Sequence, residues 1–512
     1  MATQWQTFPI EFRGGLISNL SPLQQGTNAV GSATILQNFE VTREGGYSKL
    51  KGYEKFSDST VPGSDALLAL KVVSAGRMVV ARKNASGVTE YYYGTGTTWT
   101  SMGARPLLGG KARHTSYNLN GVVKTVFVDS ANYPVVYNVS TNTTSAITGS
   151  TDVLGAEYVA LFKNTAFYGK GNTVYFTAPL TVDDFSVANG AGTINVGSDV
   201  TGLAVFRDQL IIFTKDSIKR LTGNTAADYL VSPITDRIGC LNGDTIQEVG
   251  GDIMYLAPDG IRLLSATDRI GDFGLDIASD PIAKDSAQFL NSTPNYSSIV
   301  LREKAQYRIF AYVESEQQPA ARGLIATKIV NQGASGISWS TTRGIKSFVA
   351  DSTYTGTSET VAFANTDGYV YIMDTGPSFD GEAIESIYES PYMPISDPQL
   401  RKSFYKLTLY AEPSGTMSLN LNIKYDFDTT EKQGVLQPAT QTLNSTGTAV
   451  FIYGASESVY GTATYGGTLD KVYNVNVIGS GKTIALRIED NSTNPSFTLD
   501  TALLEFRQHD RQ

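Results

Sequence analysis

The chain has 512 residues, of which 41% are hydrophobic and 17% are charged, and its formal net charge is −9. This length allows two to four domains, and the hydrophobic content suffices for buried cores, which excludes a disordered polymer. A single cysteine, Cys240, and two histidines, His114 and His509, exclude a disulfide framework and a Cys/His zinc site within one chain.

Residues 1–60 are predicted to form an irregular N-terminal arm, partly strand, rather than a domain. Turn-forming residues recur every few positions in the segments 13–18 and 20–26. The segment 33–42 alternates between apolar and polar residues as a β-strand does. The segment 44–53 adds a glycine turn and a second short strand, so turns outweigh regular structure in this part of the chain.

Residues 61–390 are predicted to form a degenerate β-propeller. Short apolar runs recur there, many of them in pairs separated by a polar turn of two to four residues. The turns at Asp259-Gly260 and Asp367-Gly368 tolerate positive φ, which is typical of hairpins. Isolated hairpins are marginal in water, so these hairpins must pack against one another. The apolar runs are residues 67–73, 77–82, 89–93, 125–128, 134–137, 158–162, 166–168, 173–176, 203–206, 210–214, 217–221, 252–257, 260–264, 360–363 and 369–372.

The recurrence of these hairpins is typical of a propeller, whose blades close radially and protect their edges. At a period of about 40–50 residues, roughly 320 residues provide about seven blades. The abundance of glycine (49) and tyrosine (28) fits short strands and tight turns better than long helices. No motif aligns from blade to blade, so a large sandwich or two stacked barrels stay as alternatives.

Residues 391–512 are predicted to form a C-terminal antiparallel β-sandwich-like, or platform, domain. Pro391, Pro394 and Pro398 lie close together at its start and predict a linker, because proline resists continuing a helix or a strand. Beyond the linker, four segments alternate between apolar and polar residues, as in an antiparallel sheet with one solvated face. These segments are 403–410, 417–425, 483–489 and 497–506.

Two short motifs in this domain carry residue types found in ligand sites. Residues 479–483 end like a phosphate-binding loop, but the full motif needs a glycine where this chain has Asn476. The residues that follow alternate as a strand, so no helix N-terminus would face a phosphate, and we interpret the motif as a hairpin turn. Asp426 and Asp428 form an i, i+2 carboxylate pair of the kind that binds metals or performs acid–base chemistry. We interpret this pair as the end of a strand.

A glycosidase is the main enzymatic alternative, because large β-folds rich in tyrosine and tryptophan often cleave sugars. It needs two carboxylates about 5–10 Å apart in a cleft with aromatic subsites. Asp183 and Asp184 are interpreted as part of a turn, and three tryptophans, Trp5, Trp99 and Trp339, are few for such a cleft. We therefore expect a protein that is not an enzyme, and we assign no catalytic, cofactor-binding or metal-binding residue.

The two histidines are interpreted as surface residues. Most hydrolytic triads need a histidine as base. His114 lies in the polar stretch 111–116, and His509 lies close to the end of the sequence. Neither position predicts a catalytic base.

The distribution of charge and hydropathy narrows the range of partners. The first six residues show no charged segment followed by an apolar run, and no stretch approaches ~18 apolar residues. We therefore expect neither a secretion signal nor a membrane-spanning segment. No block of consecutive basic residues predicts sequence-specific DNA binding. An acidic surface fits a tube that passes DNA without holding it, and it fits plain solubility equally well.

Three segments follow patterns known from one protein family. The first, 12–53, runs from a glycine pair to an ending with asparagine, glycine, lysine and glycine. The second, 247–264, is a hairpin with an Asp-Gly-Ile turn, and the third, 401–506, carries the spacing of the C-terminal domain. Together they resemble the tail tubular protein B, or tail nozzle (packaged-DNA stabilisation), proteins of short-tailed bacteriophages.

The resemblance implies a β-propeller joined to a platform-like β domain, in a homohexameric ring below the tail adaptor ring. Such a ring belongs to the tail of the virion and is assembled in the cytoplasm of the host bacterium. It would continue the DNA channel with only transient, non-specific passage of viral DNA, retain packaged DNA until ejection, and dock tail fibres or other appendages. Neither catalysis nor a cofactor is implied. In such a ring, the arm at 1–60 is expected to become ordered on a neighbouring subunit.

The alternative function is that of a phage receptor-binding protein or a polysaccharide depolymerase. A depolymerase more often shows a β-helix repeat and forms trimers. A soluble propeller enzyme is a third alternative, and the scarcity of histidine argues against it.

Overall fold

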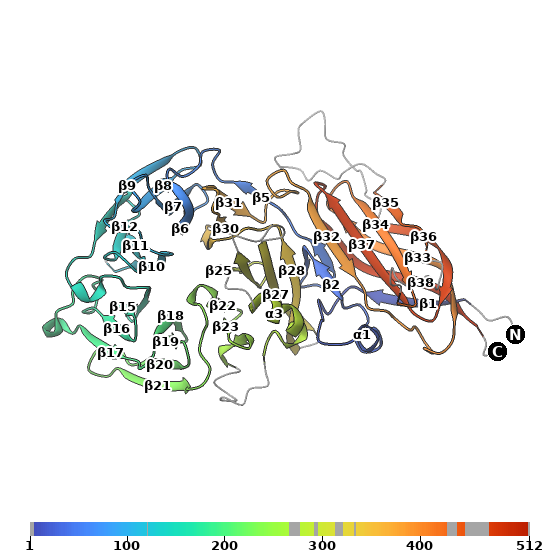
Figure 1. Cartoon of the computed structure of the whole chain (residues 1–512), viewed down its shortest axis with the longest axis horizontal. Helices are drawn as coiled ribbons and strands as arrows, with labels where there is room; N and C mark the ends of the chain where they lie inside the picture. Colours follow the sequence, from blue (N-terminus) through green and yellow to red (C-terminus); the bar gives the residue numbers. More distant parts are fainter. Residues whose placement is uncertain are drawn as a thin grey trace.

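A computed structural model of the chain describes residues 5–119, 121–265, 277–290, 295–312, 321–331, 334–427, 438–445 and 471–509. Figure 1 shows a propeller on one side of the molecule and a β-sandwich on the other, and the first and last strands, β1 (Gln6–Glu11) and β38 (Phe497–Gln508), pair with each other in the sandwich. The fold is all-β, as the sequence predicts. No helix in the described part of the chain is long and apolar enough to cross a membrane.

The described residues of the propeller form seven blades (Figure 1). Blades one to four are four-stranded antiparallel sheets, each made of consecutive strands. Blade one contains β6 (Ser64–Ser74), β7 (Arg77–Lys83), β8 (Thr89–Gly94) and β9 (Trp99–Ala104). Blade two contains β10 (Arg113–Asn118), β11 (Val123–Val128), β12 (Val135–Asn138) and β13 (Thr143–Ala146). Blade three contains β14 (Tyr158–Phe162), β15 (Thr165–Lys170), β16 (Thr173–Phe176) and β17 (Gly192–Asn195). Blade four contains β18 (Val200–Phe206), β19 (Gln209–Thr214), β20 (Ile218–Thr222) and β21 (Leu230–Thr235).

Blades five to seven depart from this pattern. Blade five has three described strands, β22 (Gln247–Val249), β23 (Asp252–Ala257) and β24 (Gly260–Leu263). Blade six contains β25 (Asn295–Leu301), β26 (Gln306–Tyr312), β27 (Ala321–Asn331) and β28 (Ala334–Arg343). Blade seven contains β29 (Val349–Thr355), β30 (Ser358–Ala364) and β31 (Val370–Met373), and its fourth strand is β5 (Tyr53–Lys55) from the N-terminal arm. Because β5 precedes blade one in the chain, this strand closes the circle of blades.

The predicted hairpins form where the turn residues allow them. In blade four, β18 and β19 are joined by Arg207 and Asp208, which have φ values of 45° and 61°. In blade seven, Gly368 (φ 87°) lies in the turn between β30 and β31. Two consecutive residues with positive φ match the right-handed twist of the flanking strands, which keeps the strands of a blade paired.

The sandwich consists of two packed sheets. One has the strand order β3-β4-β38-β33-β36, with β1 also paired to β38, and the other contains β32-β37-β34-β35. Buried and more exposed residues alternate along β33, β34 and β38, as the sequence predicts. The bounds are β1 (Gln6–Glu11), β3 (Phe39–Val41), β4 (Tyr47–Lys49), β32 (Ile384–Glu389), β33 (Lys402–Pro413), β34 (Ser418–Tyr425), β35 (Gln441–Asn444), β36 (Val472–Gly481), β37 (Ile484–Ser492) and β38 (Phe497–Gln508).

The N-terminal arm is part of the sheets of its own chain. Its strand β2 (Ile35–Gln37) pairs with β28 of blade six and with β32 of the sandwich, which makes one continuous sheet across the two domains. The expectation that the arm becomes ordered on a neighbouring subunit is therefore wrong for its described residues. The physical reason is that its apolar side chains, Phe12 and Phe39 among them, are buried in a core supplied by the same chain.

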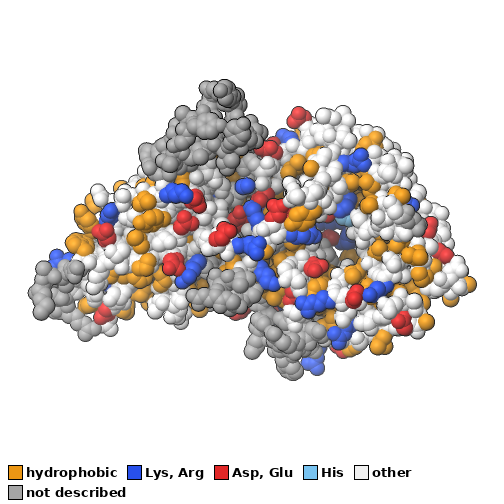
Figure 2. Space-filling view, turned by 180° about the vertical axis from the view of Figure 1, so that it is seen from behind, with side chains coloured by type: hydrophobic (Ala, Val, Ile, Leu, Met, Phe, Trp, Pro, Cys, Tyr) orange, Lys and Arg blue, Asp and Glu red, His pale blue; other side chains and the backbone are white. Residues whose placement is uncertain are grey.

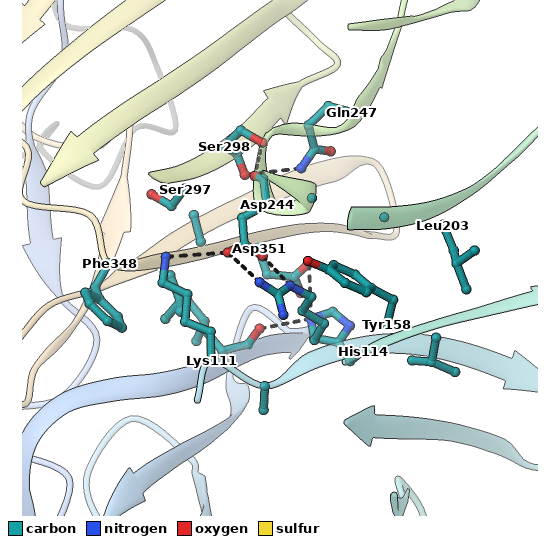
Figure 3. Close-up of a pocket in the computed structure, with 18 residues that line it drawn as sticks. Lys111, His114, Tyr158, Leu203, Asp244, Gln247, Ser297, Ser298, Phe348 and Asp351 are labelled. Carbon is teal, nitrogen blue, oxygen red and sulfur yellow. Dashed lines mark hydrogen bonds and ion pairs between the residues drawn. The ribbon is translucent and has the colours of Figure 1, made fainter. Parts of the chain in front are cut away.

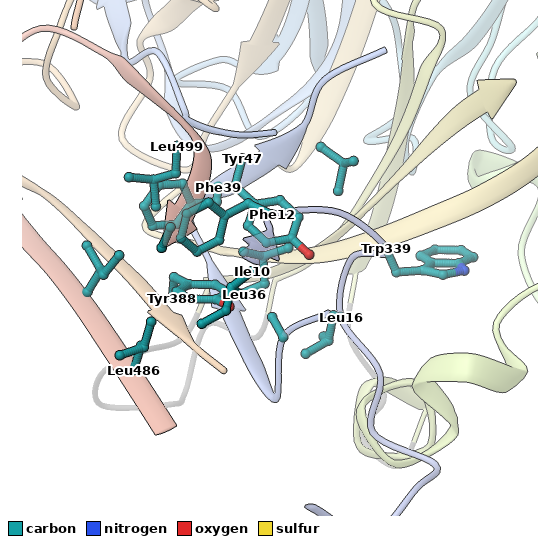
Figure 4. Close-up of a cluster of buried hydrophobic side chains, with 14 of the residues drawn as sticks. Ile10, Phe12, Leu16, Leu36, Phe39, Tyr47, Trp339, Tyr388, Leu486 and Leu499 are labelled. Carbon is teal, nitrogen blue, oxygen red and sulfur yellow. The ribbon is translucent and has the colours of Figure 1, made fainter. Parts of the chain in front are cut away.

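One hydrophobic core runs from the sandwich into blades five and six. Phe12 lies edge-on to Tyr388 at 5.1 Å between ring centroids, and Tyr47 lies 5.5 Å from the same ring (Figure 4). Trp339 of β28 belongs to this cluster, and its indole nitrogen donates to Ala278 O at 2.9 Å. The arm thus supplies apolar side chains to both domains at once.

Buried ion pairs fix the same junction. Arg308 of β26 donates to Glu40 of β3 at 3.0 Å and to Asp374 at 3.3 Å. Lys49 of β4 lies 2.6 Å from Asp490 of β37, and both side chains are almost completely buried. Charges buried in this way are stable only as pairs, so they bind the arm to defined positions in blade six and in the sandwich.

The proline-rich segment lies within the sandwich. The strand β32, which precedes Pro391, is already paired with β37 over six residue pairs. Met393 makes hydrogen bonds to Ile484, and Lys402 Nζ donates to Pro394 O at 2.5 Å. The chain therefore enters the C-terminal sheet before the prolines rather than after them.

Short helices connect these elements. The α-helix α1 (Pro22–Asn28) lies in the arm and is capped by Ser21, whose hydroxyl accepts from Gln24 N. The α-helix α3 (Ala283–Leu290) packs near β24. Short 3-10 helices span Thr151–Val153, Val187–Asn189, Gly243–Thr245 and Asp280–Ile282.

Candidate functional site: the central cavity of the propeller

A cavity of about 300 Å³ lies where the blades of the propeller converge (Figure 3). Residues from all seven blades or the loops that enter them line it. In Figure 2 the propeller surface is hollowed, with charged and histidine side chains around the hollow. The lining residues used below are Lys111, Arg113, His114, Tyr158, Gly243, Asp244, Gln247, Ser298, Phe348 and Asp351.

Asp244 occupies a fixed position on one wall. It lies in the 3-10 helix Gly243–Thr245, where its backbone N–H donates to the Asn242 side chain at 2.8 Å. Ser298 of blade six donates its hydroxyl to Asp244 O at 2.6 Å. Gly243 must be small, because a Cβ there would lie 2.1 Å from Thr201 O. The loop before blade five therefore approaches the backbone of blade four closely and points Asp244 into the cavity.

Two basic side chains from blade two face this carboxylate. Arg113 binds Asp244 through two contacts, Nε at 2.7 Å and Nη2 at 3.1 Å, and its guanidinium lies 4.5 Å from the centre of the Tyr158 ring. Lys111 Nζ lies 3.7 Å from the same carboxylate. Burial alone would raise the pKa of Asp244, but the charges of Arg113 and Lys111 outweigh it and hold that pKa below its ordinary value.

Lys111 is only partly satisfied by the protein. Its ammonium donates to Tyr296 O at 2.6 Å and lies 4.6 Å from the centre of the Phe348 ring. Burial lowers the pKa of Lys111 to about 8, although the charge of Asp244 opposes this shift. At neutral pH the side chain is still mainly protonated.

The opposite wall contains a second carboxylate and a neutral histidine. Asp351 accepts from Lys71 Nζ at 3.0 Å and from Val72 N at 2.7 Å, which links blades seven and one. His114 Nε2 lies 3.0 Å from Leu70 O and 3.9 Å from Asp351. Burial lowers the pKa of His114 to about 4, so the ring is neutral at pH 7.

The interpretation of His114 as a surface residue is wrong, because its side chain is only 18% exposed and lies inside the propeller. The polar neighbours that suggested a surface position are polar because they line the cavity. His509 is exposed, as the sequence predicts. Cys240 is fully buried, and burial raises the pKa of its thiol to about 12.

The motifs noted in the C-terminal domain lie far from this cavity in the fold. Residues 479–483 form the end of β36 and the two-residue connection to β37, and these strands belong to the two different sheets, so the interpretation as a hairpin turn is wrong. Asp426 follows the end of β34 and accepts from the backbone N–H groups of Lys482 and Thr483 at 2.6 and 3.0 Å. Its carboxylate holds this connection in place, whereas Asp428 lies outside the described residues.

Two other acidic residues and the tryptophans also lie outside the cavity. Asp183 and Asp184 form part of an irregular turn, where Asp184 accepts from Ser186 N at 2.9 Å. Trp5, Trp99 and Trp339 do not line the cavity. Within the described ranges, no group of three or more His, Cys, Asp or Glu side chains could hold a metal ion.

The cavity therefore offers paired charges that connect several blades. Arg113 and Asp244 connect blade two with the loop before blade five, across the axis. Lys71 and Asp351 connect blade one with blade seven. The sequence signals that could have indicated this site are Lys111, Arg113 and His114 near the start of an inner strand, but no local pattern identifies their partners.

Comparison with known proteins yields structural neighbours of low similarity. No family model and no curated protein matches the sequence. The extracellular domain of a B. thetaiotaomicron protein described as a one component system is 9% identical, with a TM-score of 0.38 over 72% of this chain. The match covers 46% of that neighbour, so this chain spans less than half of its length. The AfRom2 CNH domain is 10% identical, with a TM-score of 0.37 over 63% of this chain and 99% of that one.

Proposed function

We propose that the protein is a non-enzymatic structural component of the tail of a short-tailed bacteriophage. In this proposal, copies of the chain form a closed ring, a hexamer by resemblance, at the distal end of the tail tube or nozzle. The ring continues the DNA channel below the adaptor, retains packaged DNA until ejection, and offers its outer surface to fibres or appendages. A ring of identical copies uses one heterologous interface that closes by rotation.

The observation that carries the proposal is a shared core. The three segments that resemble tail nozzle proteins, 12–53, 247–264 and 401–506, are far apart in sequence and contribute to one hydrophobic cluster. Its members include Phe12 and Phe39 from the first segment, Met254 and Ile261 from the second, and Leu407 and Leu504 from the third. Resemblance in three segments that pack together supports a common architecture more strongly than resemblance in separate surface loops.

The central cavity supports a mechanical role for the propeller. One of its ion pairs connects blades across the axis and another connects the neighbouring blades one and seven, and its volume of about 300 Å³ is far too small for a DNA duplex. A DNA channel would therefore run between copies of the chain, along the axis of the ring. A polysaccharide-cleaving site needs a carboxylic acid with a raised pKa, whereas Arg113 and Lys111 hold the pKa of Asp244 below its ordinary value.

Electron microscopy of virions tests this proposal. We would label the chain with antibody in purified particles of the phage that encodes it. Label at the distal end of the tail tube is the expected result. Label on the fibres would favour the receptor-binding or depolymerase alternative, and a chain missing from the particle would overturn the proposal.

A further inference from the structure

We propose that the central cavity of the propeller binds a small hydrophilic anion through a carboxylate or phosphate group, with Lys111 as its main contact. This inference is independent of the proposed role in a phage tail. It follows from the unused donors of Lys111, from the sharing of Asp244 between Lys111 and Arg113, and from the size and polarity of the cavity lining.

The ammonium of Lys111 has more donors than the protein uses. A lysine ammonium carries three N–H donors. Among the described residues, one acceptor, Tyr296 O, lies within hydrogen-bonding distance, at 2.6 Å. Asp244 lies at 3.7 Å, beyond that distance, and its oxygens already accept two hydrogen bonds from Arg113. An oxyanion in the cavity would satisfy the remaining donors of Lys111.

Two cations on one wall of the cavity share a single carboxylate. Lys111 and Arg113 both pair with Asp244, whereas Asp351, on the other wall, is already paired with Lys71. The neutral ring of His114 adds no charge at pH 7. Lys111, at 3.7 Å, is the more distant of the two cations that share Asp244, so its charge is only partly neutralised in a mostly buried place, where incomplete pairing is costly. A ligand with one negative charge would complete its pairing.

The remaining lining favours a small polar molecule. Tyr158, Gln247 and Ser298 present polar atoms or polar side chains to the cavity. Its volume of about 300 Å³ limits the ligand to the size of a monosaccharide acid, a short carboxylate or a phosphate. These ligands share an oxyanion, and the experiment distinguishes among them.

Calorimetric titration of the full-length chain tests the proposal with three probes: sodium glucuronate, sodium acetate and inorganic phosphate, at constant ionic strength. We expect saturable one-to-one binding of at least one probe. In Lys111→Met the affinity should fall by at least about tenfold, because charge-assisted hydrogen bonds contribute that much. The control Lys215→Met removes the same charge from an exposed ion pair with Asp199, and it should bind like the wild type.

A pH series on the wild type keeps the proposal falsifiable if Lys111→Met does not fold. Acetate and glucuronate stay ionised between pH 7 and pH 9, while Lys111, whose pKa is about 8, loses its charge. Three other titratable groups face the cavity and keep their charge state between pH 7 and pH 9. They are Asp244, whose pKa is lowered, Tyr158, whose pKa is about 12, and Arg113, whose pKa is raised. His114, with a pKa of about 4, does not titrate in this window either.

We therefore expect the affinity for the probe that binds to fall as the pH rises through 8. The ion pair of Lys71 with Asp351 lies on the other wall. Neither Lys111→Met nor Lys215→Met removes it, so it is common to all the proteins compared. If phosphate alone binds, the measurement is made with phosphate at pH 8 and pH 9, where it is mainly the dianion. Absence of saturable binding by all three probes, equal affinity in Lys111→Met, or an affinity that does not change with pH would overturn the proposal.

Discussion

At the scale of single residues, His114 makes stability depend on pH. In the folded protein burial lowers its pKa to about 4, whereas an unfolded histidine titrates near 6.5. The unfolded state therefore takes up a proton first, and this contribution to stability is present above pH 6.5 and is lost as the pH falls toward 4. Between pH 6.5 and pH 5 the loss amounts to about 2 kcal/mol.

Urea unfolding of the wild type and of His114→Gln at pH 7 and pH 5 measures this contribution. Glutamine keeps a donor for Leu70 O but does not titrate. We expect the free energy of unfolding to fall between pH 7 and pH 5 by about 2 kcal/mol less in the variant than in the wild type. The same pH dependence in both proteins would show that His114 does not titrate as its buried position requires.

The buried pair of Lys49 and Asp490 is the second prediction at this scale. Lys49→Met leaves Asp490 as a buried charge without its partner, so we expect a loss of about 3–5 kcal/mol in the free energy of unfolding. The double variant Lys49→Met/Asp490→Leu removes both charges and should recover most of that loss. Lys215→Met is the matched control, because its ion pair is exposed and its loss should change stability little.

A double variant as unstable as Lys49→Met would contradict this account. It would mean that the loss comes from packing or from the hydrogen bonds of Lys49 to Ser492 O and Asn494 O. Denaturant unfolding of the wild type, Lys49→Met, the double variant and Lys215→Met separates these cases. The free energy of unfolding should fall with denaturant concentration at the same slope in all four proteins.

Residues of this kind show the limit of prediction from sequence. The segment around His114 is polar, and a local reading places it at the surface. It is inside because the inner strands of distant blades close around it, with Asp244 and Asp351 contributed from positions more than 100 residues away. Neither the cavity nor its charge pairs could be predicted from local pattern, since no sequence spacing connects these partners.

At the scale of elements, the closing strand β5 is the most sensitive to a small change. Gly52 directly precedes it, and a Cβ there would lie 1.7 Å from Ser378 O, while Tyr53 N donates to that same oxygen at 3.1 Å. We expect Gly52→Ala to destabilise the protein by about 1–3 kcal/mol, because backbone must move to admit the methyl group.

Gly76→Ala is the matched control for this prediction. Gly76 lies in the turn between β6 and β7, and a Cβ there would meet nothing within 4 Å. Thermal unfolding should show a lower midpoint for Gly52→Ala and little change for Gly76→Ala. Equal midpoints in Gly52→Ala and the wild type would mean that β5 does not need this close approach.

Many elements were predictable because their patterns are local. Alternation in 403–410 and 497–506 gave β33 and β38, and the Asp-Gly turn in blade seven gave its hairpin. Blade six, at 295–343, has no run among those predicted, since strand β26 buries Gln306 and Arg308 among apolar residues. In the arm, the predicted strand at 33–42 and the turn and strand at 44–53 contain β3 and β4, which pair locally, whereas the pairing of β2 and β5 could not be predicted because their partners lie hundreds of residues away.

At the scale of the whole molecule, the arm makes one body of two domains. Strand β2 continues blade six into the sandwich, and the shared core fills the junction (Figures 1 and 4). Two domains connected only by a linker could move separately, whereas a continuous sheet and a common core resist such motion. A rigid subunit of this kind suits the proposed ring, which must keep its shape while DNA passes.

The measurement that tests the central proposal most directly is the size and symmetry of the purified full-length protein. Light scattering would give the mass of the particle, and negative-stain images would give its symmetry. We predict a closed ring, formed by the chain alone or when the tail adaptor is added. An elongated trimer would favour the receptor-binding or depolymerase alternative, and a monomer that does not join the adaptor would contradict the proposed ring.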